Sequence, residues 1–167
     1  MADAVLPLLR QLYDGGATAD RHAAEAQLGR FAATDEGLSW ALNSLAACQL
    51  DGQALFVAAT VAELAATRRW HRLPPPQRAA LQACLWGGAT SPPAAQPAYV
   101  TGKLTAALAH VACVEWQPRF WEELGGCLGD GGRVQAGLRL LDATLDQLHG
   151  LAQTTSMGLR GKVRNAL

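Results

Sequence analysis

The chain has 167 residues, enough for one domain with a hydrophobic core, and 50% of them are apolar whereas only 6% are aromatic. Alanine and leucine, which favour helices, supply most of the apolar residues. The residues that favour strands are sparse, so the composition predicts an all-α protein. Fourteen basic residues balance fourteen acidic ones, and this neutrality argues against direct binding to nucleic acid or to an anionic membrane.

Apolar residues at helical spacing predict helices over residues 3–13 and 18–33, with Thr18 and Asp20 as candidate N-caps of the second. A third helix is predicted to start at Asp35. It ends before Asp51-Gly52, because that dipeptide favours a turn.

The longest apolar run begins at Ala54, ends at Trp70 and is followed by three prolines at 74–76. Proline suits the first turn of the next helix, because an amide at that point has no partner within the helix anyway. This next helix is predicted to end at Gly87-Gly88, before a loop rich in Pro, Ala and Ser at 90–97.

A second long helical run covers residues 99–116 and is followed by a proline. A short helix comes next and ends in a glycine-rich turn at 129–132. Residues 133–149 predict a further long helix. Residues 157–167 predict the opening turns of one more helix, cut off at the end of the chain.

Paired in order, these helices form hairpins that recur every ~40 residues. Stacked hairpins make an α-solenoid in which each hairpin is stabilised by its neighbours, so we expect about four hairpins and part of a fifth. We expect an N-terminal part at 1–89 and a continuous C-terminal part at 96–167. Half a hairpin leaves an apolar edge uncovered, which suggests the first piece of a longer protein. The expected hairpins cover residues 3–33, 36–70, 75–116 and 118–149.

Tryptophan closes both long runs. A ring of this size buries roughly 150–250 Å², and tryptophan is also enriched at interaction hot spots. We interpret Trp70 and Trp116 as anchors that fill the wedge between hairpins, in preference to hot spots. The same structural role is predicted for Trp40, Phe120 and Trp121.

No catalytic or metal-binding pattern is visible. The cysteines form no CxxC pair, and reduced, buried thiols are favoured over a disulfide or a metal site. Paired carboxylates, a catalytic triad and a phosphate-binding loop cannot be assembled, so we expect neither an enzyme nor a cofactor. No secretory signal or membrane-spanning run is seen, and we expect a soluble intracellular protein. The cysteines are Cys48, Cys84, Cys113 and Cys127.

The dense basic cluster at the end of the first long run has two interpretations. It can contact an acidic partner or a neighbouring repeat. It can also be a solvated helix end, where each cation complements the helix dipole by roughly 0.3–1 kcal/mol. The second interpretation needs no partner, and the sequence leaves both open. The cluster consists of Arg68, Arg69, His71 and Arg72.

Several motifs resemble the importin-β/exportin superfamily. The segment from Arg21 to Phe31, Arg-His-Ala-Ala-Glu-Ala-Gln-Leu-Gly-Arg-Phe, follows Leu12-Tyr13-Asp14 as in the opening helices of that family. The Arg-Arg-Trp-His-Arg-Leu-Pro-Pro segment at 68–75 is similar as well. So is the exportin-type pattern formed by Tyr99-Val100, Lys103-Leu104 and Glu115-Trp116. Pro97, six residues before Lys103, is similar to the exportin subgroup that carries actin–profilin complexes.

The resemblance covers about residues 8–149 and implies HEAT repeats, an armadillo-like helical architecture. Their second helices, here 52–70, 97–115 and 132–149, would line the concave side. It implies an exportin-like nuclear transport receptor that binds the GTP form of the small GTPase Ran and shuttles between nucleus and cytoplasm. Protein cargo and nucleoporins are the partners implied for the full-length receptor. The candidate Ran contacts are Lys103, Tyr99, Arg68, Arg69 and Arg72. For Lys103 the sequence equally allows an ordinary exposed helix lysine without a partner.

Two departures from the exportin pattern favour an alternative. Thr101-Gly102 replaces the usual Arg-Asn, and a glycine there costs the helix about 1 kcal/mol relative to alanine. Gln117 follows Trp116 where exportins have proline. The alternative is a HEAT-repeat scaffold or adaptor without GTPase binding.

Overall fold

A computed structural model describes Val5 and residues 7–8, 18–115 and 117–164, with the backbone alone at 19–21 and 153–164. Within these residues all regular secondary structure is helical, which confirms the all-α prediction. The helix predicted over residues 3–13 lies for the most part outside the described residues.

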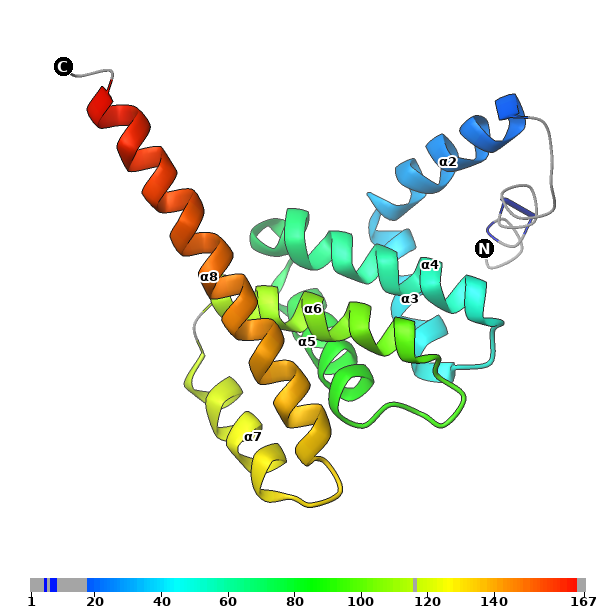
Figure 1. The fold of residues 1–167 in the computed structure, drawn as a ribbon. Coiled ribbons are helices and arrows are strands. Elements are labelled where there is room, and N and C mark those ends of the chain that lie inside the picture. Colours follow the sequence, from blue (N-terminus) through cyan, green and yellow to red (C-terminus); the bar gives the residue numbers. More distant parts are fainter. Residues whose placement is uncertain (1–4, 6, 9–17, 116, 165–167) are drawn as a thin grey trace.

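Seven α-helices follow one another in the described part of the chain (Figure 1). Side chains cap the starts of α3 and α4. The Thr34 hydroxyl accepts a hydrogen bond from the Gly37 amide at 3.0 Å, and an Asp51 carboxylate oxygen accepts one from the Ala54 amide at 2.8 Å. The helices are α2 (Thr18–Ala32), α3 (Asp35–Ala47), α4 (Gly52–Leu64), α5 (Pro75–Thr90), α6 (Ala98–Val114), α7 (Pro118–Gly129) and α8 (Val134–Arg164).

The sequence predicted one continuous helix up to Trp70. The regular α-helix instead ends at Leu64. After α4 a π-helical turn covers Ala65–Arg69, and a 3₁₀ turn covers Trp70–Arg72. A π turn holds one more residue than an α turn. Ala65, Ala66 and Trp70 are all buried here, so the wider turn coincides with continuous packing on the core.

Two predicted helix ends are wrong. α5 passes through Gly87 and Gly88 and ends at Thr90. A side chain at position 88 would collide with Leu104 of α6, so Gly88 permits close approach of the two helices and does not end α5. α8 runs without a break to Arg164, so the separate helix predicted at 157–167 is the end of α8 as far as the structure describes it. Gly150 is tolerated within it, since glycine weakens a helix by about 1 kcal/mol without ending it.

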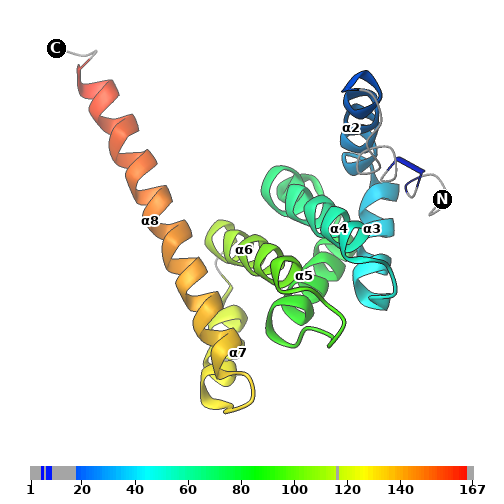
Figure 2. The ribbon, with the colours of Figure 1, turned by 45° about the vertical axis from the view of Figure 1, so that its right-hand side comes forward.

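Consecutive helices pack as pairs, and the pairs pack on one another. α3 contacts α4, α5 contacts α6 and α7 contacts α8, while α4 also lies against α6, and α6 against α8. α3 contacts α5 on the other side of the pairs. Figure 2 shows α4, α6 and α8 in succession, while α2 and the C-terminal half of α8 extend away from the other helices. The packed helices therefore form two layers through the middle of the molecule.

Small residues let the layers approach closely. Ala54, Ala58, Ala59 and Ala62 on α4 are fully buried, on the helix that contacts both α3 and α6. None of the helices in the described part of the chain has the length and apolar character needed to cross a membrane.

Candidate protein-binding surface

Two exposed aromatic rings and a lysine come together where α4 lies against α6. Phe56 and Tyr99, 37% and 54% exposed, pack edge to face with their ring centroids 5.8 Å apart. The Lys103 Nζ atom lies 5.1 Å from the centroid of the Phe56 ring and 2.5 Å from Oε2 of Glu63. We refer to Phe56, Glu63, Tyr99 and Lys103 as the α4–α6 patch.

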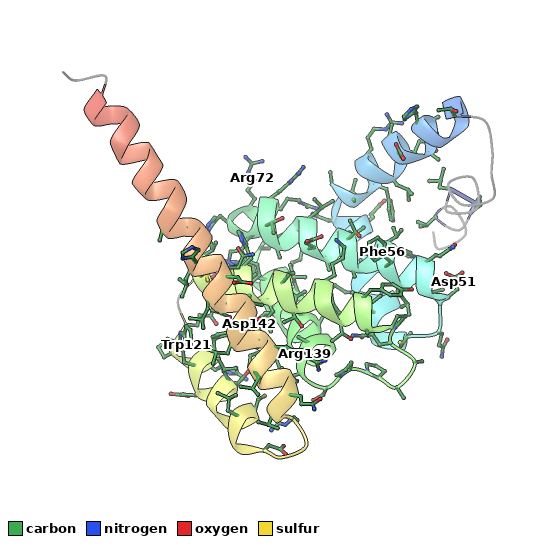
Figure 3. The ribbon with its side chains drawn as sticks, viewed as in Figure 1. Asp51, Phe56, Arg72, Trp121, Arg139 and Asp142 are labelled. Carbon is green, nitrogen blue, oxygen red and sulfur yellow. The ribbon has the colours of Figure 1, made fainter. Side chains whose placement is uncertain are left out.

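The start of α4 positions the tyrosine of this patch. A side chain at Gly52 would collide with the Tyr99 hydroxyl, so the tyrosine lies directly over the first turn of α4. Asp51 caps that turn, and Figure 3 shows it at the beginning of the helix, with Phe56 further along. The aromatic part of the patch is thus formed by side chains from both helices.

The composition of the patch suits contact with another protein. Tyrosine is among the residues enriched in protein-binding hot spots, and a cation above an aromatic ring is attracted by about 0.5–1 kcal/mol at exposed sites. Sequence reasoning identified Tyr99 and Lys103 but missed Phe56 and Glu63. Phe56 and Glu63 are seven residues apart, which places both on one face of the helix, and this spacing could have indicated that they share a surface.

The basic side chains that are clustered in the sequence do not share one environment in the structure. Arg69 turns back, donating to the Thr34 carbonyl oxygen at 3.0 Å and pairing with Asp35 at 2.5 Å. It joins the π turn to the start of α3, so its guanidinium is engaged within the chain. Arg68, His71 and Arg72 are exposed, and Figure 3 shows Arg72 at the end of the α4 run opposite Phe56. The basic residues are therefore separate from the α4–α6 patch.

Most of the predicted aromatic anchors are buried. Trp70, Trp40 and Phe120 lie in the core, and Trp121 is half-buried against it. Phe120 packs edge to face on both Trp86 and Trp121, with centroid distances of 5.8 and 5.1 Å. Trp116 lies outside the described residues. Trp70, Trp40 and Phe120 are thus core residues, and their role as anchors between hairpins stays a prediction.

Trp70 also takes part in a polar contact that the sequence did not reveal. Its indole Nε1 donates to Oε2 of Glu115 at 2.6 Å, and the same carboxylate oxygen lies 3.6 Å from Arg78. These residues come from the 3₁₀ turn after α4, from the end of α6 and from α5. One carboxylate therefore connects two successive helix pairs.

A small hollow of about 240 Å³ lies between α6 and α8, near the start of α6. Small residues of α6, among them Gly102, form one wall, and Arg139 and Asp142 of α8 form the other (Figure 3). A side chain at position 102 would meet no atom within 4 Å. The packing around α6 thus does not require glycine at position 102, where the chain departs from the exportin pattern.

Replacing Gly102 with alanine is therefore expected to raise the free energy of unfolding by about 0.5–1 kcal/mol, because alanine restricts the unfolded chain and favours the helix. Thermal unfolding followed by circular dichroism should show a melting temperature about 1–4 °C higher for a chain of this length. A melting temperature below that of the parent chain would mean that the α6–α8 hollow has no room for the added methyl group.

The thiols are not paired with one another. Cys48, Cys84 and Cys113 are half-buried, and Cys127 is buried. Burial raises the pKa of Cys84 from 9.0 to about 11 and also raises the pKa of Cys113. The Cys113 thiol lies 3.8 Å from the Thr144 carbonyl oxygen of α8. Thiols in this state are weak nucleophiles at neutral pH, because the thiolate is the reactive form.

The shifted pKa of Cys84 leads to a measurable pH dependence. Alkylation of Cys84, followed by mass spectrometry, is expected to reach half its maximal rate near pH 11 in the folded chain and near pH 9.0 in urea. Because the folded state holds this proton more tightly, the stability contributed by Cys84 is complete below pH 9.0 and is lost as the pH rises through about 11. Identical pH profiles in the two states would show that the thiol is not desolvated by folding.

Among the described residues, no group of three or more His, Cys, Asp or Glu side chains is placed to hold a metal ion. No family model, no curated protein and no solved structure matches the chain. The fold and the exposed patch therefore provide the basis for a functional proposal.

Proposed function

We propose that this chain is the N-terminal segment of an exportin-like nuclear transport receptor, an α-solenoid of HEAT-type hairpins. In this proposal the layer of α4, α6 and α8 binds the GTP form of the small GTPase Ran. Binding of Ran supports the export of protein cargo from nucleus to cytoplasm. Cargo and nucleoporins would be held by further repeats.

The arrangement of the helix pairs is the observation that carries the proposal. α4 packs against α6 and α6 against α8, which is the neighbour relation that the resemblance implies for the second helices of successive HEAT hairpins. The α4–α6 patch exposes Tyr99 and Phe56 on two of these helices. Support also comes from the buried Trp70, which fills the junction between hairpins where the resemblance has its Arg-Arg-Trp motif.

The mechanism rests on coupling between two ligands. A partner that contacts several neighbouring helices favours one curvature of a solenoid, and a second ligand that fits the same curvature then binds more tightly. GTP hydrolysis rearranges the switch segments of a small GTPase, so the contacts with the solenoid would be lost and both ligands released.

Binding of Ran to the immobilised chain in its GTP-loaded and GDP-loaded forms tests the proposal. We expect retention of the GTP form, weakened about tenfold or more by Tyr99→Ala, because an exposed aromatic side chain at an interface commonly contributes more than 1 kcal/mol. Arg119→Ala on α7 is the control, since this exposed side chain lies away from the α4–α6 patch. Equal retention of both nucleotide forms, or of neither, contradicts the proposal.

One contact favours the second candidate, a HEAT scaffold without GTPase binding. The Lys103 ammonium, which the resemblance suggests as a Ran contact, is paired with Glu63 inside the chain. If this pair is purely structural, Lys103→Ala lowers stability and leaves any Ran binding unchanged. A stable complex with another protein, together with no affinity for either form of Ran, would favour the scaffold.

A further inference from the structure

The proposed function does not use the basic side chains at the end of the α4 run. Arg68, His71 and Arg72 are exposed on the π and 3₁₀ turns that follow α4, and we refer to them as the basic turn. Figure 3 shows Arg72 at this end of the run, with Phe56 of the α4–α6 patch nearer its start. The basic turn is thus a second exposed surface, and it shares no residue with the patch.

The two guanidiniums of the basic turn lie on one side of the chain. Between them in the sequence, Trp70 is buried and Arg69 turns back to Asp35 at the start of α3. Arg68 and Arg72 are four residues apart, a spacing that places two side chains on the same side of a helical chain. They are therefore carried on the exposed side of a turn that the buried tryptophan anchors in the core.

No carboxylate of the described residues neutralises the basic turn. Its side chains form neither a hydrogen bond nor an ion pair with any residue that the structure describes. Glu63, the one acidic residue of α4, is already paired with Lys103. Elsewhere in the described residues, the arginines with a carboxylate partner are Arg69, Arg78, Arg119 and Arg133, and those without one are Arg30 and Arg139, which lie singly on α2 and α8. Unpaired guanidiniums thus come together at the basic turn.

The helix dipole leaves these guanidiniums available to a ligand. A cation near the C-terminal end of a helix is stabilised by the dipole without a hydrogen bond to it. In this turn the Leu73 amide, and neither guanidinium, bonds to the carbonyl oxygens of Arg69 and Trp70, at 3.1 and 3.2 Å. The five N–H donors of each guanidinium therefore remain free, in a fork that matches the two oxygens of a carboxylate.

We propose that the basic turn binds an acidic segment of another protein, with one carboxylate on Arg68 and a second on Arg72. Residues four apart in a helix are about 6 Å apart along its axis, and alternate residues of an extended chain are about 6.6 Å apart. Acidic residues at alternate positions of an extended segment therefore match the two guanidiniums. The proposal does not rest on the proposed function, because no residue of the α4–α6 patch takes part.

A nucleic acid fits this surface less well than an acidic protein segment. Proteins that bind nucleic acid neutralise several phosphates and have a positive field over a wide surface. The chain has no net charge, and the basic turn offers two guanidiniums. Two neighbouring carboxylates are enough to pair with both.

Fluorescence anisotropy with the full chain and a fluorescein-labelled ten-residue peptide tests the proposal. Glutamate alternates with serine in the peptide, and a comparison peptide has glutamine in place of each glutamate. We expect the glutamate peptide to bind about tenfold more tightly than the glutamine peptide, with an affinity that falls as salt screens the charges. Equal binding of the two peptides, or no binding of either, contradicts the proposal.

Two double variants locate the binding site. Arg68→Gln combined with Arg72→Gln removes both charges of the basic turn and should weaken binding of the glutamate peptide about tenfold. Arg30→Gln combined with Arg139→Gln is the matched control, because it removes the same charge from two other exposed, unpaired arginines, and it should weaken binding less than about twofold. Glutamine and arginine have similar helix propensities, so both variants should fold. An equal loss in the two variants would mean attraction to overall charge and would overturn the proposal.

A labelled single-stranded DNA of six nucleotides, whose five phosphates match the five glutamates in number, tests the alternative ligand. We expect it to bind more weakly than the glutamate peptide. Tighter binding of the DNA, lost on substitution of Arg68 and Arg72, would assign the basic turn to nucleic acid and overturn the proposal. None of these measurements uses Ran, so failure here and failure of the proposed function can be told apart.

Discussion

Replacing Trp70 with alanine is expected to lower the free energy of unfolding by about 3–5 kcal/mol, the usual cost of removing a large buried ring. The side chain is only 2% exposed, and its indole nitrogen bonds to Glu115 at 2.6 Å. Alanine would leave a cavity between two helix pairs and would also remove the donor from a partly buried carboxylate. Domains are commonly stable by about 5–15 kcal/mol, so the variant should unfold at much lower urea concentration.

A second substitution separates the ring from its hydrogen bond. Trp70→Phe keeps an aromatic ring in the junction but has no N–H group, so it should cost less than the alanine variant and mainly report the bond to Glu115. Tyr99→Ala is the surface control, because that ring is more than half exposed. Urea unfolding followed by circular dichroism compares the three. If Trp70→Ala is no more destabilising than Tyr99→Ala, the tryptophan is not an anchor between hairpins.

Local signals explain why the start of most helices was predictable. Prolines begin α5, as the sequence predicted, and Asp51, predicted only as part of a turn, caps α4 directly after that turn. These devices act over three or four residues, so they can be read without knowledge of the rest of the chain. The order of the helices and their pairing as neighbours followed from them.

Helix ends were less predictable, because they depend on packing. Gly88 was interpreted as a stop, yet it lies within α5 where Leu104 approaches. The π turn after α4 has no local sequence signal of its own, and it occurs where Ala65, Ala66 and Trp70 are buried together. Only the tertiary structure shows what these residues meet.

The candidate surface shows the same division. Tyr99 and Lys103 were identified through a family resemblance, but the pairing of Lys103 with Glu63, forty residues away, depends on how α4 lies on α6. The basic cluster was visible as a run of residues. The sequence did not show that Arg69 turns inward while Arg72 is exposed, because neighbouring side chains on a helix turn can face different surroundings.

Replacing Gly37 with alanine is expected to destabilise the chain by about 1–3 kcal/mol, although alanine is the better helix former. A methyl group at this position would collide with the carbonyl oxygen of Phe31, a backbone atom that cannot rotate away. That carbonyl already accepts hydrogen bonds from the Thr34 amide at 3.0 Å and from the Thr34 hydroxyl at 2.7 Å. Relief of the collision would therefore disturb the turn between α2 and α3.

The same shift would weaken the start of α3, because the Thr34 hydroxyl also accepts from the Gly37 amide as its N-cap bond. Gly29→Ala is the matched control: it lies on α2, and its added methyl group would meet no atom within 4 Å. That variant should gain about 0.5–1 kcal/mol through helix propensity alone. Parallel urea titrations of the two variants should thus move in opposite directions from the parent chain. A stabilised Gly37→Ala chain would mean that α2 and α3 meet in a looser turn, one in which Phe31 and Gly37 are not in contact.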